Sequence, residues 1–217
     1  EDDPHWKCYM NLMKALFQRH PIRVSVAGSV ESISHITAET LYACHKAFYD
    51  PANMVLCVAG PVDPEHICGI AREILPKQAG PIAAKDYGEQ ESAQAAQSCI
   101  EERMEVSAPI FHLGWKGDPK TDGEDRLRQE LVGGLALEVL LGNSSPLYAR
   151  LYREGLINQE FGYSYESSSG CAFLAADGES RDPEAVRLAV AEEAARIGRE
   201  GVDPALWERV KKGVYGN

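Results

Sequence analysis

Histidines and carboxylates are the residues with which a hydrolytic zinc site is usually built. Such a site commonly places two histidines about one helical turn apart, with a nearby glutamate as the general base. The six histidines of this sequence stand at positions 5, 20, 35, 45, 66 and 112, and no two of them lie within four residues. Neither H-E-x-x-H nor the inverted H-x-x-E-H is present. We therefore predict no metal ligand and no catalytic base in these 217 residues.

The stretch GNSSPLYARLYREGL, residues 143–157, offers two serines as possible nucleophiles. The surrounding sequence is not a G-x-S-x-G elbow, and no Cys–His signature, P-loop or G-x-G-x-x-G motif occurs in the chain. Ser144 or Ser145 before Pro146 is instead typical of a helix start, with serine as the N-cap and proline as the first helical residue. Gly155 suits the left-handed residue after the helix. We interpret the stretch as a capped helix.

Composition excludes several classes of partner. The net charge of −11 disfavours binding to a phosphate backbone, since the basic residues are not clustered. No apolar run approaches the roughly 20 residues that cross a bilayer. The six cysteines are scattered without a C-x-x-C pair, which favours a reducing compartment over a disulfide framework. We expect a cytoplasmic protein that binds neither nucleic acid nor membrane.

Periodicity and capping signals predict a series of helices. They are expected after Asp3-Pro4, after Thr37, after Asp63-Pro64, over GEDRLRQELVGGLALEVLLG, over the 143–157 stretch, and after Asp182-Pro183 and Asp203-Pro204. The first should bury an apolar face that ends at Phe17, and His20-Pro21 should close it. The second should bury Leu41, Cys44, His45 and Phe48, and the third Ile67, Ile70, Ala71 and Ile74. IRVSVAGSVESISHI fits either an extended segment or a loop.

Strand signals and one linker complete the pattern. NMVLCVAG is a short apolar run that predicts a strand buried on both faces. Alternation predicts strands around Ile100–Val106 and Phe111–Trp115, and over EFGYSYES and GCAFLAADG. Residues 77–98 are polar and small without a period, which is typical of a linker. Grouped strands and helices predict an α+β fold, with helices packed on a mostly antiparallel sheet.

Two long segments resemble the pitrilysin/insulinase-type zinc peptidases, or inverzincins, among them the predicted zinc-dependent peptidases of bacteria. They are HPIRVSVAGSVESISHITAETLYACHKAFYDPANMVLCVAGPVDPEHI and NSSPLYARLYREGLI. The resemblance covers nearly the whole chain. It implies two similar half-domains, each a sheet covered by helices, that face each other across a peptide-binding chamber. It also implies that zinc is held by an H-x-x-E-H motif and a further glutamate, all upstream of residue 1.

On this resemblance the chain is a middle fragment. Residues 1–76 would be the C-terminal part of the first, zinc-bearing half-domain, residues 77–98 the linker, and residues 99–217 most of the second half-domain. The chain begins without methionine, as an excised piece would. Zinc would belong to the full-length parent and not to this fragment.

The resemblance also implies substrate contacts from the second half-domain, an arginine followed by a tyrosine. Arg153 and Tyr163 are the candidates, and Phe161 or Tyr165 could fill the aromatic position instead. Arg153 has an equally good structural explanation, because a cation at a helix C-terminus interacts favourably with the helix dipole.

Three hypotheses follow for function. The parent is a zinc metalloendopeptidase with a peptide substrate, for which this fragment forms part of the chamber wall. Alternatively, the parent is a non-catalytic subunit that acts through protein–protein interaction, in a homo- or hetero-oligomer with a peptidase-like partner. A third hypothesis sets the resemblance aside and treats the chain as an acidic α+β binding module without chemistry.

Overall fold

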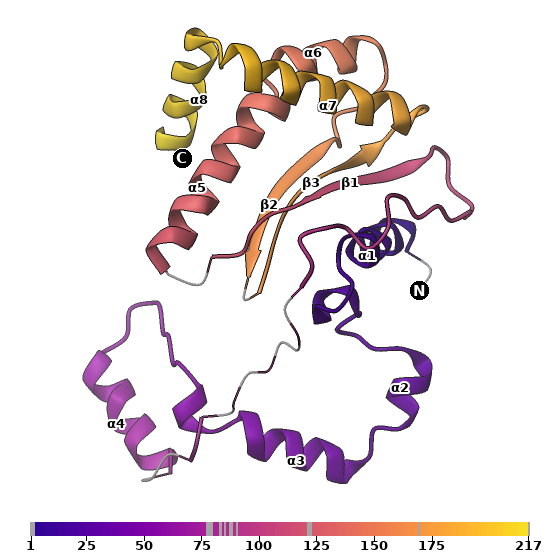
Figure 1. The fold of residues 1–217 in the computed structure, drawn as a ribbon. Helices are drawn as coiled ribbons and strands as arrows, with labels where there is room; N and C mark the ends of the chain where they lie inside the picture. The colour runs from indigo at the N-terminus through magenta and orange to yellow at the C-terminus, as the bar shows by residue number, and fades with distance from the viewer. Residues whose placement is uncertain are drawn as a thin grey trace. The chain divides into compact units, whose positions relative to one another are not determined.

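The structure is a computed structural model, and it describes residues 3–76, 80–82, 84, 86, 89, 91–120, 123–168 and 170–216. The chain divides into two compact units. Residues 1–25 and 87–217 form one, which we call the sheet unit, and residues 26–86 form the other, which we call the helical unit. Figure 1 shows the elements of both.

The sheet unit is built on three antiparallel strands in the order β1-β3-β2. The strands are β1 (Ile110–Lys116), β2 (Gly162–Ser168) and β3 (Cys171–Glu179). Because β3 pairs on both edges, Ala176 lies opposite Leu113 on one side and opposite Tyr163 on the other. Alternate residues of β3 therefore belong to two different cores, one on each face of the sheet.

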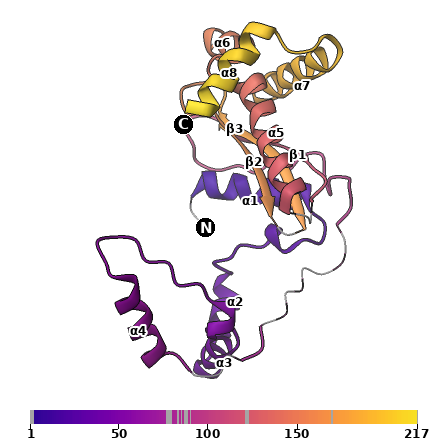
Figure 2. The same cartoon turned by 90° about the vertical axis from the view of Figure 1, so that its left-hand side faces the viewer.

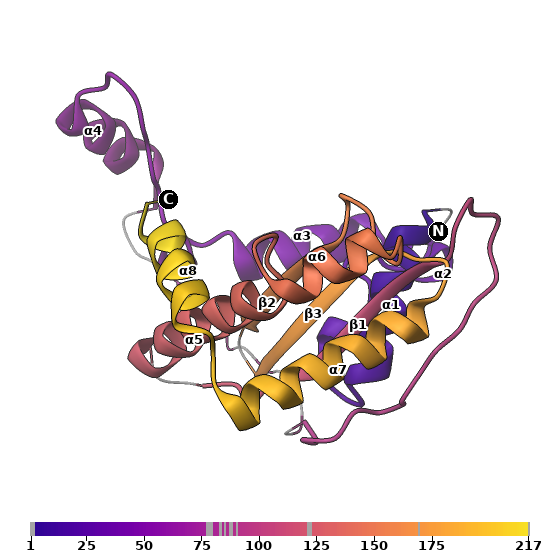
Figure 3. The same cartoon turned by 90° about the horizontal axis from the view of Figure 1, so that it is seen from above.

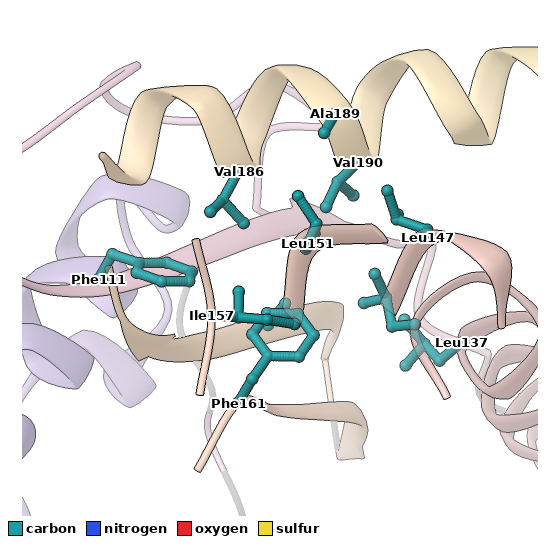
Figure 4. Packing of buried hydrophobic residues seen from close by; sticks show 11 residues of the cluster. Phe111, Leu137, Leu147, Leu151, Ile157, Phe161, Val186, Ala189 and Val190 are labelled. Carbon is teal, nitrogen blue, oxygen red and sulfur yellow. The ribbon is translucent and has the colours of Figure 1, made fainter. Parts of the chain in front are cut away.

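Helices from the C-terminal part of the chain cover one face of the sheet. They are α5 (Gly123–Leu141), α6 (Pro146–Arg153) and α7 (Pro183–Glu200). Figure 4 shows how side chains from these helices and from the sheet converge on one core. Its buried members are Phe111, Leu137, Leu141, Leu147, Leu151, Ile157, Phe161, Ala176, Val186, Ala189 and Val190. A smaller cluster of Val139, Leu206 and Val210 holds α8 (Pro204–Gly216) against α5.

The opposite face of the sheet is covered by α1 (Pro4–Leu16). Figures 1 and 2 show α1 on the side of the strands away from α7, and in the view from above in Figure 3 α7 lies in front of the strands and α1 behind them. Phe173 of β3 is fully buried under this helix together with Met13 and Phe17. A Cβ on Gly114 of β1 would come within 2.7 Å of Leu12 Cδ1, so the absent side chain allows α1 to approach the strand closely.

The described residues of the helical unit contain three α-helices, α2 (Val30–Ser34), α3 (Ala38–Phe48) and α4 (Pro64–Ile74), and a short 3-10 helix at Pro51–Asn53. The described residues between 26 and 86 include no strand. All three have side-chain N-caps, from Ser29, Thr37 and Asp63. None of the described residues of this unit is buried. The unit thus has local structure without a hydrophobic core.

Several sequence predictions are confirmed. The fold is α+β with an antiparallel sheet, and helices begin after Asp3, Thr37, Asp63, Ser145, Asp182 and Asp203 as the caps predicted. The strands predicted over EFGYSYES, GCAFLAADG and Phe111–Trp115 are β2, β3 and β1. The undecided segment 22–36 contains the short helix α2, which a reciprocal capping box between Ser29 and Ser32 stabilises.

Four other predictions are wrong for this chain. NMVLCVAG is not a strand, and neither is the segment from Ile100 to Val106, because neither pairs with a neighbouring strand in the described structure. The predicted inner face of α3 is exposed, including Leu41 and Phe48. The predicted inner face of α4 is not buried either, since Ile70 and Ile74 are exposed and Ile67 and Ala71 are only partly covered. Periodicity identified which side of α3 is apolar, but burial also requires a second surface.

The predicted division at residues 76 and 98 stays a prediction, since it refers to half-domains of a longer protein. Part of the predicted linker, residues 77–79, 83, 85, 87, 88 and 90, lies outside the described residues. In this chain α1 packs on the sheet of the C-terminal part, so residues 1–25 group with 87–217.

Candidate functional site

The helix that carries Arg153 is positioned by its serine cap. The Ser145 hydroxyl accepts a hydrogen bond from the backbone N–H of Tyr148 at 3.1 Å, and Pro146 is the first helical residue. Ser145 is buried, and Gly155 has φ of +64° just beyond the helix. These contacts confirm the predicted helix start. They also give the Ser145 hydroxyl a structural role, as an N-cap.

Arg153 is the last residue of α6 and is exposed. Its guanidinium makes no hydrogen bond or ion pair with any described residue. Some arginines are paired: exposed Arg187 forms a bidentate pair with Glu184, and half-buried Arg196 contacts Glu193 and Glu200. Arg150 of α6 and Arg199 of α7 resemble Arg153, being exposed and without a hydrogen bond or ion pair to a described residue. Arg153 is therefore a cation whose donors remain available to a carboxylate or carbonyl outside the described structure.

Tyr163 lies on β2 and is half-buried against the helical layer. Its phenol O–H donates a hydrogen bond to the Glu138 carboxylate of α5. Burial, that hydrogen bond and the negative charge of Glu138 raise the pKa of Tyr163 well above its usual range. The phenol is therefore a neutral donor at physiological pH, and Glu138 holds it in place.

The two alternative aromatic residues have different surroundings. Phe161 is buried in the main core, with ring centroids 6.3 Å from those of Phe111 and Tyr148, so it could contact a peptide only if that core opened. Tyr165 packs its ring over Gly133 of α5, where a Cβ would come within 2.6 Å of the ring. Burial raises the pKa of Tyr165, with Glu130 adding to the effect.

The structure does not join Arg153 to any of these aromatic residues. They lie in the same unit, Arg153 at the end of α6 and Tyr163 on β2, but no hydrogen bond, ion pair or ring contact connects them in the described chain. Tyr163 and Tyr165 share one face of β2, as residues two apart in a strand do. The substrate-contact pair of the sequence analysis therefore stays a prediction.

Zinc does not fit the residues that this structure describes. No three His, Cys, Asp or Glu side chains among them are grouped so that they could hold a metal ion. All six cysteines are free thiols, and four of them are exposed. No metal-dependent step can be assigned to the described part of this chain.

Sequence reasoning missed a buried ion pair between Glu91, in the predicted linker, and Lys116 of β1. The Glu91 carboxylate accepts backbone hydrogen bonds from Gln18, Arg19 and His20 at 2.8–2.9 Å, and Lys116 Nζ of β1 lies 3.1 Å from it. Burial raises the pKa of Glu91, but these four donors outweigh that effect and lower it to about 2. No local signal could have found this pair, because Lys116 is 25 residues away in sequence.

Comparison with known proteins places this arrangement in a family. The sequence model of one protein family, the peptidase M16 inactive domain, matches residues 35–214 of this chain. The chain therefore belongs to the M16, pitrilysin-type, peptidase family, which confirms the resemblance seen in the sequence.

Among curated relatives, the uncharacterized zinc protease YmfH of Bacillus subtilis is 36% identical over 189 residues. That match covers 85% of this chain and 44% of YmfH. The uncharacterized zinc protease ML0855 of Mycobacterium leprae is 37% identical over 73 residues, which cover 34% of this chain and 16% of that protein.

Solved structures agree with this assignment. The crystal structure of an M16-like peptidase from Alicyclobacillus acidocaldarius matches with a TM-score of 0.89 at 30% identity, over 99% of this chain and 51% of that one. An M16 inactive domain from Pseudomonas fluorescens matches with a TM-score of 0.78 at 20% identity, which shows the fold alone, over 100% of this chain and 52% of that one. The chain spans about half the length of the relatives that it matches.

Within the described residues, no helix is both long and apolar enough to cross a membrane.

Proposed function

We propose that this chain is a non-catalytic part of a zinc-dependent endopeptidase. In that protein it would form part of the wall of the chamber that holds the peptide. The supporting observation is that the chain matches the M16 inactive domain over most of its length and has no H-x-x-E-H motif of its own. The zinc and its ligands would lie in the part of the longer protein that precedes residue 1. Residues 1–76 would then complete the first half-domain, and residues 99–217 would form most of the second.

Within that proposal, Arg153 would contact the bound peptide and Tyr163 would assist it. Arg153 offers exposed guanidinium donors with no partner in the described chain, which suits a peptide carbonyl or C-terminal carboxylate. Tyr163 offers a phenol that Glu138 orients. The phenol O–H already donates its hydrogen bond to Glu138. Tyr163 would therefore contact the peptide by accepting a hydrogen bond on its phenol oxygen, or through its ring edge.

The proposal is tested with the longer protein encoded by the gene, assayed on a fluorogenic peptide with zinc present. Arg153→Ala should lower kcat/KM by about tenfold, the effect of one lost hydrogen bond to a charged group. Arg187→Ala is the matched control, because Arg187 is also an exposed arginine but is paired with Glu184. Unchanged turnover in Arg153→Ala would contradict the substrate contact and favour a binding module without chemistry.

A second measurement addresses the metal. Elemental analysis of chain 1–217 should find no stoichiometric zinc, whereas the longer protein should hold one zinc per molecule. One tightly bound zinc in the chain alone would contradict the proposal. A longer protein without zinc, active only when a peptidase-like partner is added, would show instead that the parent is a non-catalytic subunit.

A further inference from the structure

The side chain of Glu138 lies between a strand and the connection from α5 to α6. Glu138 stands in the last turn of α5 and is partly buried. Its Oε2 accepts the hydrogen bond from the Tyr163 phenol of β2. Its Oε1 lies over Gly142, where a Cβ would come within 2.5 Å of that oxygen. One carboxylate therefore contacts β2 on one side and the first residue after α5 on the other.

Gly142 leaves the space that this carboxylate occupies. Gly142 is buried, and a Cβ on it would also lie 2.8 Å from Glu138 Cδ and 2.3 Å from the Glu138 carbonyl oxygen. Both distances are shorter than van der Waals contact, so a side chain at position 142 would displace the carboxylate. The absence of that side chain lets Glu138 fold back over the helix end and still reach Tyr163.

Backbone hydrogen bonds connect the same helix end to α6. The Gly142 N–H donates to the Glu138 carbonyl at 3.0 Å, and the Ser145 N–H donates to the Gly142 carbonyl at 2.8 Å. The buried Ser145 hydroxyl then caps α6, and Arg153 is the last residue of that helix. The phenol of Tyr163 and the helix that carries Arg153 are therefore both attached to the end of α5.

We infer that Glu138 is a positioning residue, which holds the phenol of Tyr163 at a fixed place relative to Arg153. This inference rests on the proposed function, in which Arg153 and Tyr163 contact the peptide. It adds that the two contacts act as one unit, and that the unit depends on a residue that does not itself touch the peptide.

The physical reason is the freedom that Glu138 removes. A phenol has one proton, so its donation to Glu138 fixes which side of the oxygen can accept a hydrogen bond. Two contacts that are held in place before binding lose little side-chain entropy when the peptide arrives. Without Glu138, the peptide itself would have to order the phenol of Tyr163. We therefore expect the loss of Glu138 to raise KM more than it lowers kcat.

The first test is a double-mutant cycle in the longer protein, assayed on a fluorogenic peptide. Tyr163→Phe should lower kcat/KM about fivefold, the effect of one lost hydrogen bond. Glu138→Ala should lower it by a similar factor, mainly through KM. The double variant should lose no more than either single variant, because both changes remove the same contact. Independent, additive losses would overturn the inference.

Two further variants control for a merely structural role of Glu138. Glu138→Gln keeps an oxygen that accepts the phenol hydrogen bond, so it should retain at least about half of the wild-type kcat/KM. Glu192→Ala should leave kcat/KM unchanged, since Glu192 is an exposed glutamate of α7. If Glu138→Gln lost as much activity as Glu138→Ala, the inference would be wrong.

A spectroscopic measurement on chain 1–217 tests the link without turnover. With isotope-labelled tyrosine, the Tyr163 phenol is the NMR signal that is absent from Tyr163→Phe. In Glu138→Gln this phenol should ionise at a lower pH than in the unchanged chain, because the negative charge that helps to raise its pKa is gone. An unchanged titration would contradict the role of Glu138.

The inference and the proposed function fail in distinguishable ways. Unchanged turnover in Tyr163→Phe would contradict the proposed peptide contact, and with it the inference. A loss in Tyr163→Phe with wild-type turnover in Glu138→Ala would overturn the role of Glu138 and leave the proposed function standing.

Discussion

The sheet unit and the helical unit begin from the same local signals and end in different states. Helices of both units start at side-chain caps, with Ser145 on α6 and Thr37 on α3. In the sheet unit, the apolar faces of α1 and α5–α7 meet a sheet and are buried. In the helical unit, the apolar side of α3 meets no described surface and stays exposed. Local capping forms a helix, but only a second apolar layer gives it tertiary stability.

The largest expected difference in the free energy of unfolding is between two phenylalanine-to-alanine variants, one in each unit. Phe173 of β3 is fully buried, whereas Phe48 of α3 is 53% exposed. Phe173→Ala should lower the free energy of unfolding of chain 1–217 by about 3–5 kcal/mol, since it removes transfer energy and leaves a cavity. Phe48→Ala should change it by less than about 0.5 kcal/mol. Urea denaturation followed by circular dichroism measures both, and equal losses would show that the helical unit has a core of its own.

An intermediate effect should come from the Glu91 ion pair, through pH. The pKa of Glu91 falls from 4.5 to about 2 on folding, so the folded state favours the ionised carboxylate. Its contribution should therefore be fully present above pH 4.5 and be lost as the pH falls toward 2. The shift corresponds to about 3 kcal/mol.

Glu91→Gln should accordingly lower stability at pH 7 and flatten the loss of stability between pH 5 and pH 2. Glu65→Gln is the control, because Glu65 is an exposed carboxylate in the helical unit. Thermal unfolding across that pH range compares the two variants. If Glu91→Gln kept the wild-type acid dependence, another group would control it.

The smallest expected effect tests the caps. Ser145→Ala should cost about 1 kcal/mol in global unfolding, because α6 belongs to the main core. Thr37→Ala removes a comparable cap but should leave global unfolding unchanged and lower only the helical signal of the native state. A matching loss in both variants would mean that the two units unfold as one.

Much of the sheet unit could be predicted from the sequence. The Asp-Pro and Ser-Pro caps gave the helix starts, and alternation gave β1, β2 and β3. The failed strand predictions are NMVLCVAG, in the helical unit, and the segment from Ile100 to Val106, in the sheet unit. Both have the composition of strands, yet a strand exists only when another strand pairs with it. Composition does not tell whether that partner is available.

The knowledge of the candidate site also comes partly from the sequence and partly from the structure. The sequence alone named Arg153 and Tyr163 as candidate substrate contacts through a family resemblance, which stays a prediction, and it contains no H-x-x-E-H motif. The structure showed which of the candidate side chains have hydrogen-bonding groups without a partner among the described residues. Arg153 has no partner in the described chain, Tyr163 is held by Glu138, and Phe161 is buried in the core.

The sequence by itself determined the helix starts, the α+β class and the family, because caps, periodicity and ordered motifs are local properties of the chain. Tertiary structure decided what those elements contact. It placed α1 on the sheet, joined Glu91 to Lys116 across 25 residues, and left the apolar side of α3 exposed. These outcomes depend on surfaces that are distant in sequence, and short-range patterns carry no information about which distant surfaces will meet.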